Sequence, residues 1–181
     1  MRYRRLRIAG ASYFFTVVTY KRRPLFSEAA AVKLLQAAVE GVRAKRPFEL
    51  EAQVVMPDHL HAIWALPDDD IDYPTRWRLI KEAFTRTYIA THSPPPRDAG
   101  RQHRGEQAVW QGRYWEHLIR DDEDFSAHVE YIHLNPVKHG FASAPSDWPH
   151  STFGDWVAQG LYDVAWGSQG PIELPKWAGR E

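Results

Sequence analysis

The segment most informative about the fold is Val54-Val55-Met56-Pro57-Asp58-His59-Leu60-His61-Ala62-Ile63-Trp64. It predicts a buried strand, a tight turn at Pro57-Asp58, and a second strand carrying histidines at positions i and i+2. Because side chains alternate faces along a strand, His59 and His61 point the same way, about 7 Å apart, while Leu60 points into apolar surroundings. Two imidazoles on one face can share a metal ion. The alternative is a pair of hydrogen-bonded surface histidines.

Length and composition narrow the class of protein. The 181 residues suit one domain with an appended tail. Without cysteine there are no disulfides or thiolate sites, so any metal must be held by His, Asp, Glu, Asn or Gln. No run approaches the roughly 18 apolar residues of a membrane span, and residues 13–20 are too short for a signal core. We therefore expect a cytoplasmic protein that does not bind a membrane.

The formal net charge is zero, but the charges are segregated along the chain. Acids gather at residues 68–72 and 121–124, whereas residues 1–27 contain bases and no acid. A second basic set comprises Arg76, Arg78, Lys81, Arg86, Arg97, Arg101, Arg104 and Arg113. Such segregation predicts a basic face for a polyanion. Ordinary solvated surface is the alternative.

Periodicity and end signals predict the local structure. We expect a helix over 28–45 with Ser27 as its cap, and a helix over 76–92 capped by Thr75. A third helix should be capped by Asp121 or Asp122 and end near Asn135, before Pro136. The remaining predicted segments are strands over 13–20, 48–56 and 59–66, an irregular basic loop over 93–107, and a fourth strand region over 109–112 and 114–119.

This order of elements is that of the ferredoxin-like split βαβ fold, an α+β class. In that fold the first and third strands are central in an antiparallel sheet, and two helices cover one face. His59 and His61 would then lie mid-sheet on the other face, near the extra C-terminal helix. We expect residues 1–140 to form the main domain with its basic arm. Residues 141–181 should form an irregular Trp- and Pro-rich tail that packs on or extends the same domain.

The third helix carries polar residues on one face. Phe125, Val129 and Ile132 form its apolar line. Tyr131 and Asn135 are neighbours one turn apart beside that line. The tyrosine could equally be a core residue with a bonded hydroxyl, and the asparagine a simple helix-end residue.

Two long segments resemble the signatures of the REP-associated tyrosine transposases, which belong to the single-tyrosine HUH transposase class. They are Met56-Pro57-Asp58-His59-Leu60-His61 and Tyr131-Ile132-His133-Leu134-Asn135-Pro136-Val137-Lys138-His139-Gly140. The runs at 110–111, 115–121 and 147–151 are also similar, so the resemblance covers the chain from Tyr13 to about Trp166.

The resemblance implies a ferredoxin-like core with the catalytic tyrosine on the C-terminal helix. Tyr131 would be the nucleophile, and His59, His61 and Asn135 would bind a divalent cation, Mg²⁺ or Mn²⁺. The implied activity is DNA transposition: cleavage and rejoining of single-stranded DNA at hairpin-forming repeats through a 5′-phosphotyrosine intermediate, which includes endonuclease activity. The implied assembly is a monomer, with a homodimer as the alternative.

Other residues are assigned roles around that site. His117 and His128 are candidates to support the metal-binding residues. Trp115, with Trp110 and Tyr114, could stack on unpaired bases or lie in the core. The candidate DNA contacts are Arg2, Arg4, Arg5, Arg7, Lys21, Arg22, Arg23, Lys81, Arg113, Trp115 and Lys138. Two other functions stay open: a hairpin-DNA-binding protein without catalysis, and a metal-dependent nuclease in which Tyr131 is structural.

Overall fold

The computed structural model describes residues 7–168, 172–175 and 177–179. In chain order the helices and strands are β1 (Ser12–Val18), α1 (Ala29–Arg43), β2 (Glu49–Val55), β3 (His59–Ala65), α2 (Tyr73–Thr91), α3 (Ala99–His103), β4 (Trp115–Leu118), α4 (Asp122–Lys138) and α5 (Phe153–Ala158). Short 3-10 turns lie at Tyr20–Arg22, Leu25–Ser27 and Pro145–Asp147.

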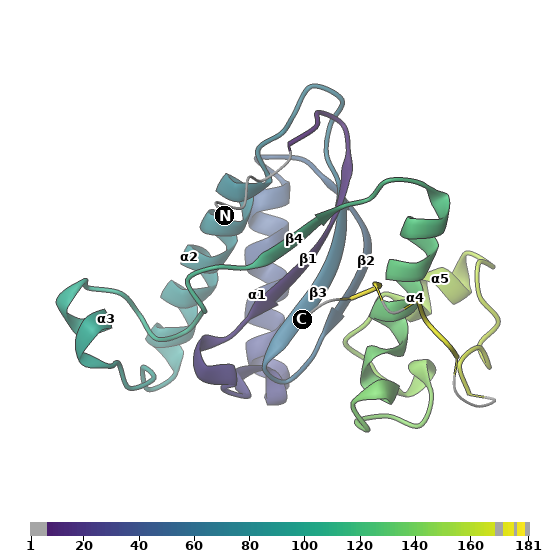
Figure 1. The fold of residues 1–181 in the computed structure, drawn as a ribbon. Helices are drawn as coiled ribbons and strands as arrows, with labels where there is room; N and C mark the ends of the chain where they lie inside the picture. The colour runs from purple at the N-terminus through teal and green to yellow at the C-terminus, as the bar shows by residue number, and fades with distance from the viewer. Residues whose placement is uncertain (1–6, 169–171, 176, 180–181) are drawn as a thin grey trace.

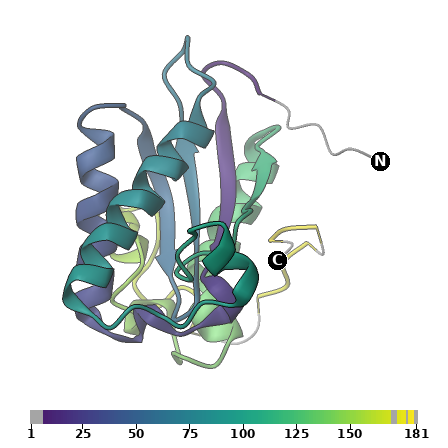
Figure 2. The same cartoon turned by 90° about the vertical axis from the view of Figure 1, so that its left-hand side faces the viewer.

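The four strands form one antiparallel sheet in the order β2-β3-β1-β4. The first and third strands are therefore central, as in the predicted ferredoxin-like arrangement. Helices α1 and α2 lie side by side on one face, and α4 lies on the other (Figures 1 and 2). The predicted α+β fold is confirmed.

The central strand β1 is buried on both faces, which explains its nearly continuous apolar sequence. Tyr13, Phe15 and Val17 pack in the core under α1 and α2, while Phe14 packs in the smaller core under α4. The same alternation on β3 sends Leu60 to the helix-covered face. His59 and His61 consequently face α4.

Two of the three predicted helix caps are wrong, whereas the predicted cap Asp121 of α4 is confirmed, because its side chain accepts a hydrogen bond from the Asp124 backbone N–H at 2.8 Å. Glu28 occupies the cap position of α1, and no side chain caps the helix there. Asp72 caps α2 by accepting a hydrogen bond from the backbone N–H of Thr75. Asp, Ser and Thr all suit a cap, so the sequence pattern does not choose between neighbouring candidates. One face of α2 is apolar and packs in the core, with these side chains buried: Trp77, Ile80, Phe84 and Tyr88.

Pro136 lies inside α4, so the predicted end of that helix near Asn135 is also wrong. Proline lacks an N–H and crowds the carbonyl four residues earlier, which is costly in the middle of a helix. Here the disturbance is confined to the last turn, and the backbone N–H of His139 still donates to the Asn135 carbonyl at 3.0 Å. The extra turn carries Lys138 round to the side of the helix that bears Tyr131.

Two further segments differ from expectation. The predicted irregular loop contains the five-residue helix α3, capped by the Asp98 side chain. The fourth strand is limited to Trp115–Leu118. Trp110 forms only an isolated bridge with Thr19, and its ring is buried against Phe26 and Phe84. Because it is packed in this way, Trp110 is unsuited to stacking on a base.

Residues after α4 cover the outer edge of β2. Trp148 Nε1 donates to the Val55 carbonyl at 3.0 Å, and Trp156 Nε1 donates to the Glu51 carbonyl at 2.9 Å. Ser151 forms an isolated bridge with Val54. These contacts occupy backbone groups that an uncovered edge strand would expose. In the part of the chain that the structure describes, no helix combines the length and apolarity needed to cross a membrane.

Candidate active site

His59 and His61 lie together on the α4 side of β3. Their ring centres are 4.9 Å apart, and both side chains are buried. Strand register places them opposite Val18 and Thr16 of β1. The sequence prediction that both imidazoles share a sheet face is therefore met by the geometry.

Each imidazole of this pair has its Nδ1 engaged by a neighbouring side chain. His59 Nδ1 lies 2.6 Å from Asp58 Oδ1, and His61 Nδ1 lies 2.9 Å from Thr16 Oγ1. Arg22 in turn contacts Asp58 at 3.3 Å. A histidine whose Nδ1 is held by a carboxylate or hydroxyl presents its Nε2 to a metal ion in a fixed orientation. Sequence reasoning missed both supporting residues, although Asp58 stands directly before His59.

Tyr131 of α4 faces this pair on the same side of the sheet, and Asn135 lies one helical turn further along α4. The Tyr131 ring meets the His61 ring edge-on, with centres 5.2 Å apart. Asn135 is fully buried, and neither its amide oxygen nor its amide nitrogen has a hydrogen-bond partner among the described residues. A buried amide left in that state costs about 1–3 kcal/mol, so a partner from outside the protein would relieve it. Two imidazoles and an amide oxygen are donors that fit a divalent cation.

Basic side chains surround the same end of the sheet. The turn at residues 21–23 lies near His59, because the preceding Thr19 backbone N–H donates to the Asp58 carbonyl at 2.9 Å. Lys21 and Arg22 are exposed there. Lys138 is also exposed, and the ring of the next residue, His139, lies 5.8 Å from that of His59.

The C-terminal tail covers Tyr131. Gly179 has a positive φ of 67°, and a Cβ at this position would fall inside the Tyr131 ring. The glycine backbone therefore lies directly against the ring, whose residue is only 2% exposed. No periodicity or motif in the tail signals this contact.

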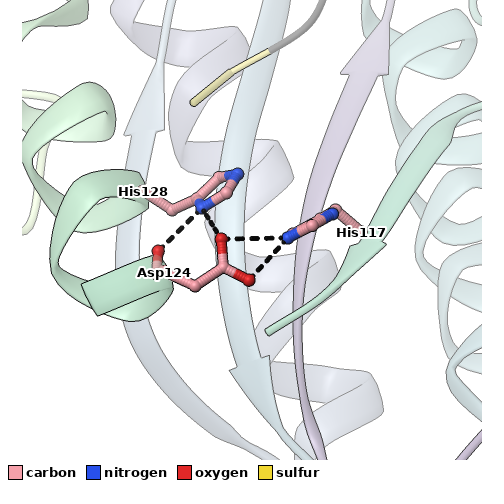
Figure 3. A group of neighbouring side chains, drawn as sticks. All are labelled: His117, Asp124 and His128. Atoms are coloured by element: carbon pink, nitrogen blue, oxygen red, sulfur yellow. Dashed lines mark hydrogen bonds and ion pairs between the residues drawn. The ribbon is translucent and has the colours of Figure 1, made fainter. Parts of the chain in front are cut away.

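A second group of polar side chains joins β4 to α4 (Figure 3). Its members are His117, Asp124 and His128, with one potential ligand atom from each lying within 4.8 Å of the others. His117 Nε2 is 2.8 Å from Asp124 Oδ2, and His128 Nδ1 is 3.1 Å from Asp124 Oδ1. By residue type, this group is a second possible metal-binding set.

Internal hydrogen bonds already account for this second group. The backbone N–H of Arg120 donates to Asp124 Oδ2 at 3.0 Å, and its Nε donates at 2.8 Å. With His117, these donors fill most of the acceptor sites of the carboxylate, and His128 Nδ1 donates to the Asp124 backbone carbonyl at 2.8 Å. Burial raises the pKa of Asp124, but the hydrogen bonds from Arg120 and His117 outweigh burial and hold the pKa well below its usual value. Burial also lowers the pKa of His128, so this imidazole is held neutral.

His117 and His128 were predicted to support the metal-binding residues. They stack on each other instead, with ring centres 4.7 Å apart. Phe14 links the two groups, since its ring centre lies 4.7 Å from that of His128 and 5.4 Å from that of His61. The Phe14 ring therefore lies against both groups, and a supporting role for His117 and His128 stays a prediction.

The candidate DNA contacts are spread over several elements. Arg2, Arg4 and Arg5 lie outside the described residues. Arg7 and Arg113 are exposed, whereas Arg23 and Trp115 are half-buried. Lys81 donates to the Gln111 carbonyl at 2.7 Å, and burial together with the nearby Arg101 charge lowers its pKa to about 8. Lys81 is therefore engaged within the protein rather than extended into solvent.

Comparison with known proteins gives a consistent picture. No family model matches the chain. A REP-associated tyrosine transposase of Escherichia coli (strain K12) is 43% identical over 164 residues, which cover 91% of this chain and 89% of the relative. A solved structure of a REP-associated tyrosine transposase bound to a REP hairpin matches with a TM-score of 0.80 at 40% identity, covering 100% of this chain and 98% of the other. The chain therefore belongs to the REP-associated tyrosine transposases.

Proposed function

We propose that this protein is a metal-dependent transposase that cleaves and rejoins single-stranded DNA at hairpin-forming repeats through a 5′-phosphotyrosine intermediate. The observation that carries this proposal is the approach of Tyr131 to His61, with the buried Asn135 amide, which no described residue satisfies, one turn away. A tyrosine beside two imidazoles and an amide is an arrangement suited to phosphoryl transfer.

The roles follow from the chemistry of the residues. His59, His61 and Asn135 would hold Mg²⁺ or Mn²⁺, which when bound draws charge from the scissile phosphate. Tyr131 attacks the phosphorus and displaces a 3′-hydroxyl, so the 5′ side stays on the enzyme as an ester. A phenol has a pKa near 10 and is a weak nucleophile by itself, which is why this attack needs an electrophilic partner. Because no water is consumed, another 3′-hydroxyl can reverse the step, and strand transfer results.

Single-stranded hairpin DNA is the proposed substrate. The relative of known structure is bound to a REP hairpin and shares 40% of its sequence with this chain. Lys21, Arg22 and Lys138 lie around the candidate site, where they could contact phosphates. Tyr131 faces His61 of its own chain, which supports a monomer whose active site needs no second copy.

The test uses the full chain, Mn²⁺ and a labelled oligonucleotide that contains a hairpin with single-stranded flanks. We expect a covalent protein–DNA adduct that survives denaturation and disappears in Tyr131→Phe. Tyr88→Phe, on α2 at the helix-covered face, is the matched control and should retain the adduct. Cleavage that persists in Tyr131→Phe would establish a plain nuclease instead. Hairpin binding without cleavage by the wild type would establish a binding protein.

A further inference from the structure

Lys138 places a positive charge beside the oxygen of the proposed nucleophile. Its Nζ lies 3.5 Å from the Tyr131 hydroxyl and 4.6 Å from the centre of the Tyr131 ring. Tyr131, Asn135 and Lys138 follow one another at helical intervals of four and three, so their side chains share one face of α4. The turn of helix that continues past Pro136 is what brings the ammonium into this position.

No acidic side chain among the described residues neutralises the Lys138 ammonium. A cavity of about 700 Å³ opens between Tyr131 and the tail, and Lys138 is the one charged side chain among its described lining residues. Arg120, near the other end of α4, differs because its charge is balanced by Asp124 at 2.8 Å. Lys138 is therefore a cation whose charge is available to the Tyr131 oxygen and to a phosphate bound beside it.

We propose that Lys138 is a catalytic residue that stabilises the negative charge developing on the Tyr131 oxygen. This proposal rests on the proposed function. In cleavage, the bond from that oxygen to phosphorus forms as the bond to the 3′ oxygen breaks. The phenolic proton passes to water, and the departing 3′ oxygen takes up a proton. In rejoining, a 3′-hydroxyl attacks and the tyrosine oxygen leaves as a phenolate. A fixed positive charge beside this oxygen favours both directions, because negative charge develops there in each.

The experiment compares Lys138→Met, Lys138→Arg and the matched control Lys45→Met. Lys45 is an exposed lysine that follows α1, on the opposite side of the sheet from α4. The rate of adduct formation is measured for the full chain with Mn²⁺ at saturating labelled hairpin DNA, and the Kd for the same DNA is measured separately. We expect Lys138→Met to slow adduct formation about ten- to a hundredfold, as for loss of a group that stabilises developing charge. Lys138→Arg should recover most of the rate, and Lys45→Met should match the wild type.

Several results would overturn the proposal. If Lys138→Met weakens the Kd but reacts at the wild-type rate at saturation, Lys138 is only a phosphate contact. If both substitutions slow the reaction equally and both lower the Tm, its role is structural. Failure of the wild type to form any adduct would overturn the proposed function itself, and this is known before the variants are compared.

Discussion

Two groups of polar side chains lie against α4, and each contains a pair of histidines. In the group at β3, His59 Nδ1 donates to the Asp58 carboxylate and His61 Nδ1 is hydrogen-bonded to the Thr16 hydroxyl, so both partners lie outside the pair. In the group at β4, His117 and His128 both turn a ring nitrogen toward the same buried carboxylate, Asp124. The first pair is held at Nδ1 by residues outside the pair, whereas the second group balances its own charge internally.

This difference shows that a metal site cannot be identified only by the presence of residue types that commonly bind metals. The β4 group has the more typical composition, two histidines and a carboxylate, yet Arg120 supplies its counter-charge. The β3 group has one carboxylate, Asp58, which is engaged by His59 Nδ1, and Asn135 on α4 has a buried amide that no described residue satisfies. We infer that the β3 group binds the metal and that the β4 group braces α4 against the sheet.

The largest expected effect is the difference in the rate of adduct formation between a variant of the β3 group and a variant of the β4 group. His61→Ala should reduce adduct formation about a thousandfold, which matches the several kcal/mol of charge stabilisation that a bound metal supplies. Hairpin affinity should change little, because it rests on the basic side chains. His117→Ala, the matched change in the β4 group, should keep adduct formation within tenfold of the wild type. Equal losses in the two variants would contradict the division into a metal site and a brace.

The next effect concerns stability. Asp124→Ala removes the shared partner of two histidines and an arginine, and should lower the free energy of unfolding by about 2–3 kcal/mol. Asp122→Ala, an exposed acid in the same first turn of α4, should cost no more than about 1 kcal/mol. Urea denaturation at pH 7 measures both. A near-neutral Asp124→Ala would show that the β4 group is not a brace.

Particular residues show how far sequence reasoning reaches. The shared face of His59 and His61 could be predicted because strand alternation is a local rule, and the sheet order followed from the order of elements. The end of α4 was missed because the bias of the residue before a proline away from helical geometry is only a tendency, and here the helix continues for two residues beyond Pro136. The contact of Gly179 with Tyr131 had no local signal at all, since the packing of a distant tail creates it.

A smaller effect tests the support given to the β3 pair. Thr16→Val keeps the shape of the side chain but removes the hydroxyl that holds His61 Nδ1. Loss of such a supporting partner typically costs ten- to a hundredfold in metal affinity, about 1.4–2.7 kcal/mol. Calorimetric titration with Mn²⁺ measures it, with Thr87→Val on the far side of α2 as the control. Unchanged Mn²⁺ affinity in Thr16→Val would mean that the hydroxyl does not orient a ligand.

The smallest expected effect is a change in the acid dependence of stability. Hydrogen bonds from Arg120 and His117 outweigh the effect of burial and depress the pKa of Asp124 in the folded protein, so the unfolded chain takes up a proton at this residue more readily. The stabilisation is therefore present above the unfolded pKa, near 3.9, and is lost as the pH falls below it. Asp124→Asn cannot titrate, so its deficit of about 1–2 kcal/mol relative to the wild type should shrink between pH 5 and pH 3. Urea denaturation of both proteins across that range measures the deficit. A deficit that stays constant would mean that the Asp124 charge contributes nothing, and the β4 group would then lack the internal balance that distinguishes it from the pair at β3.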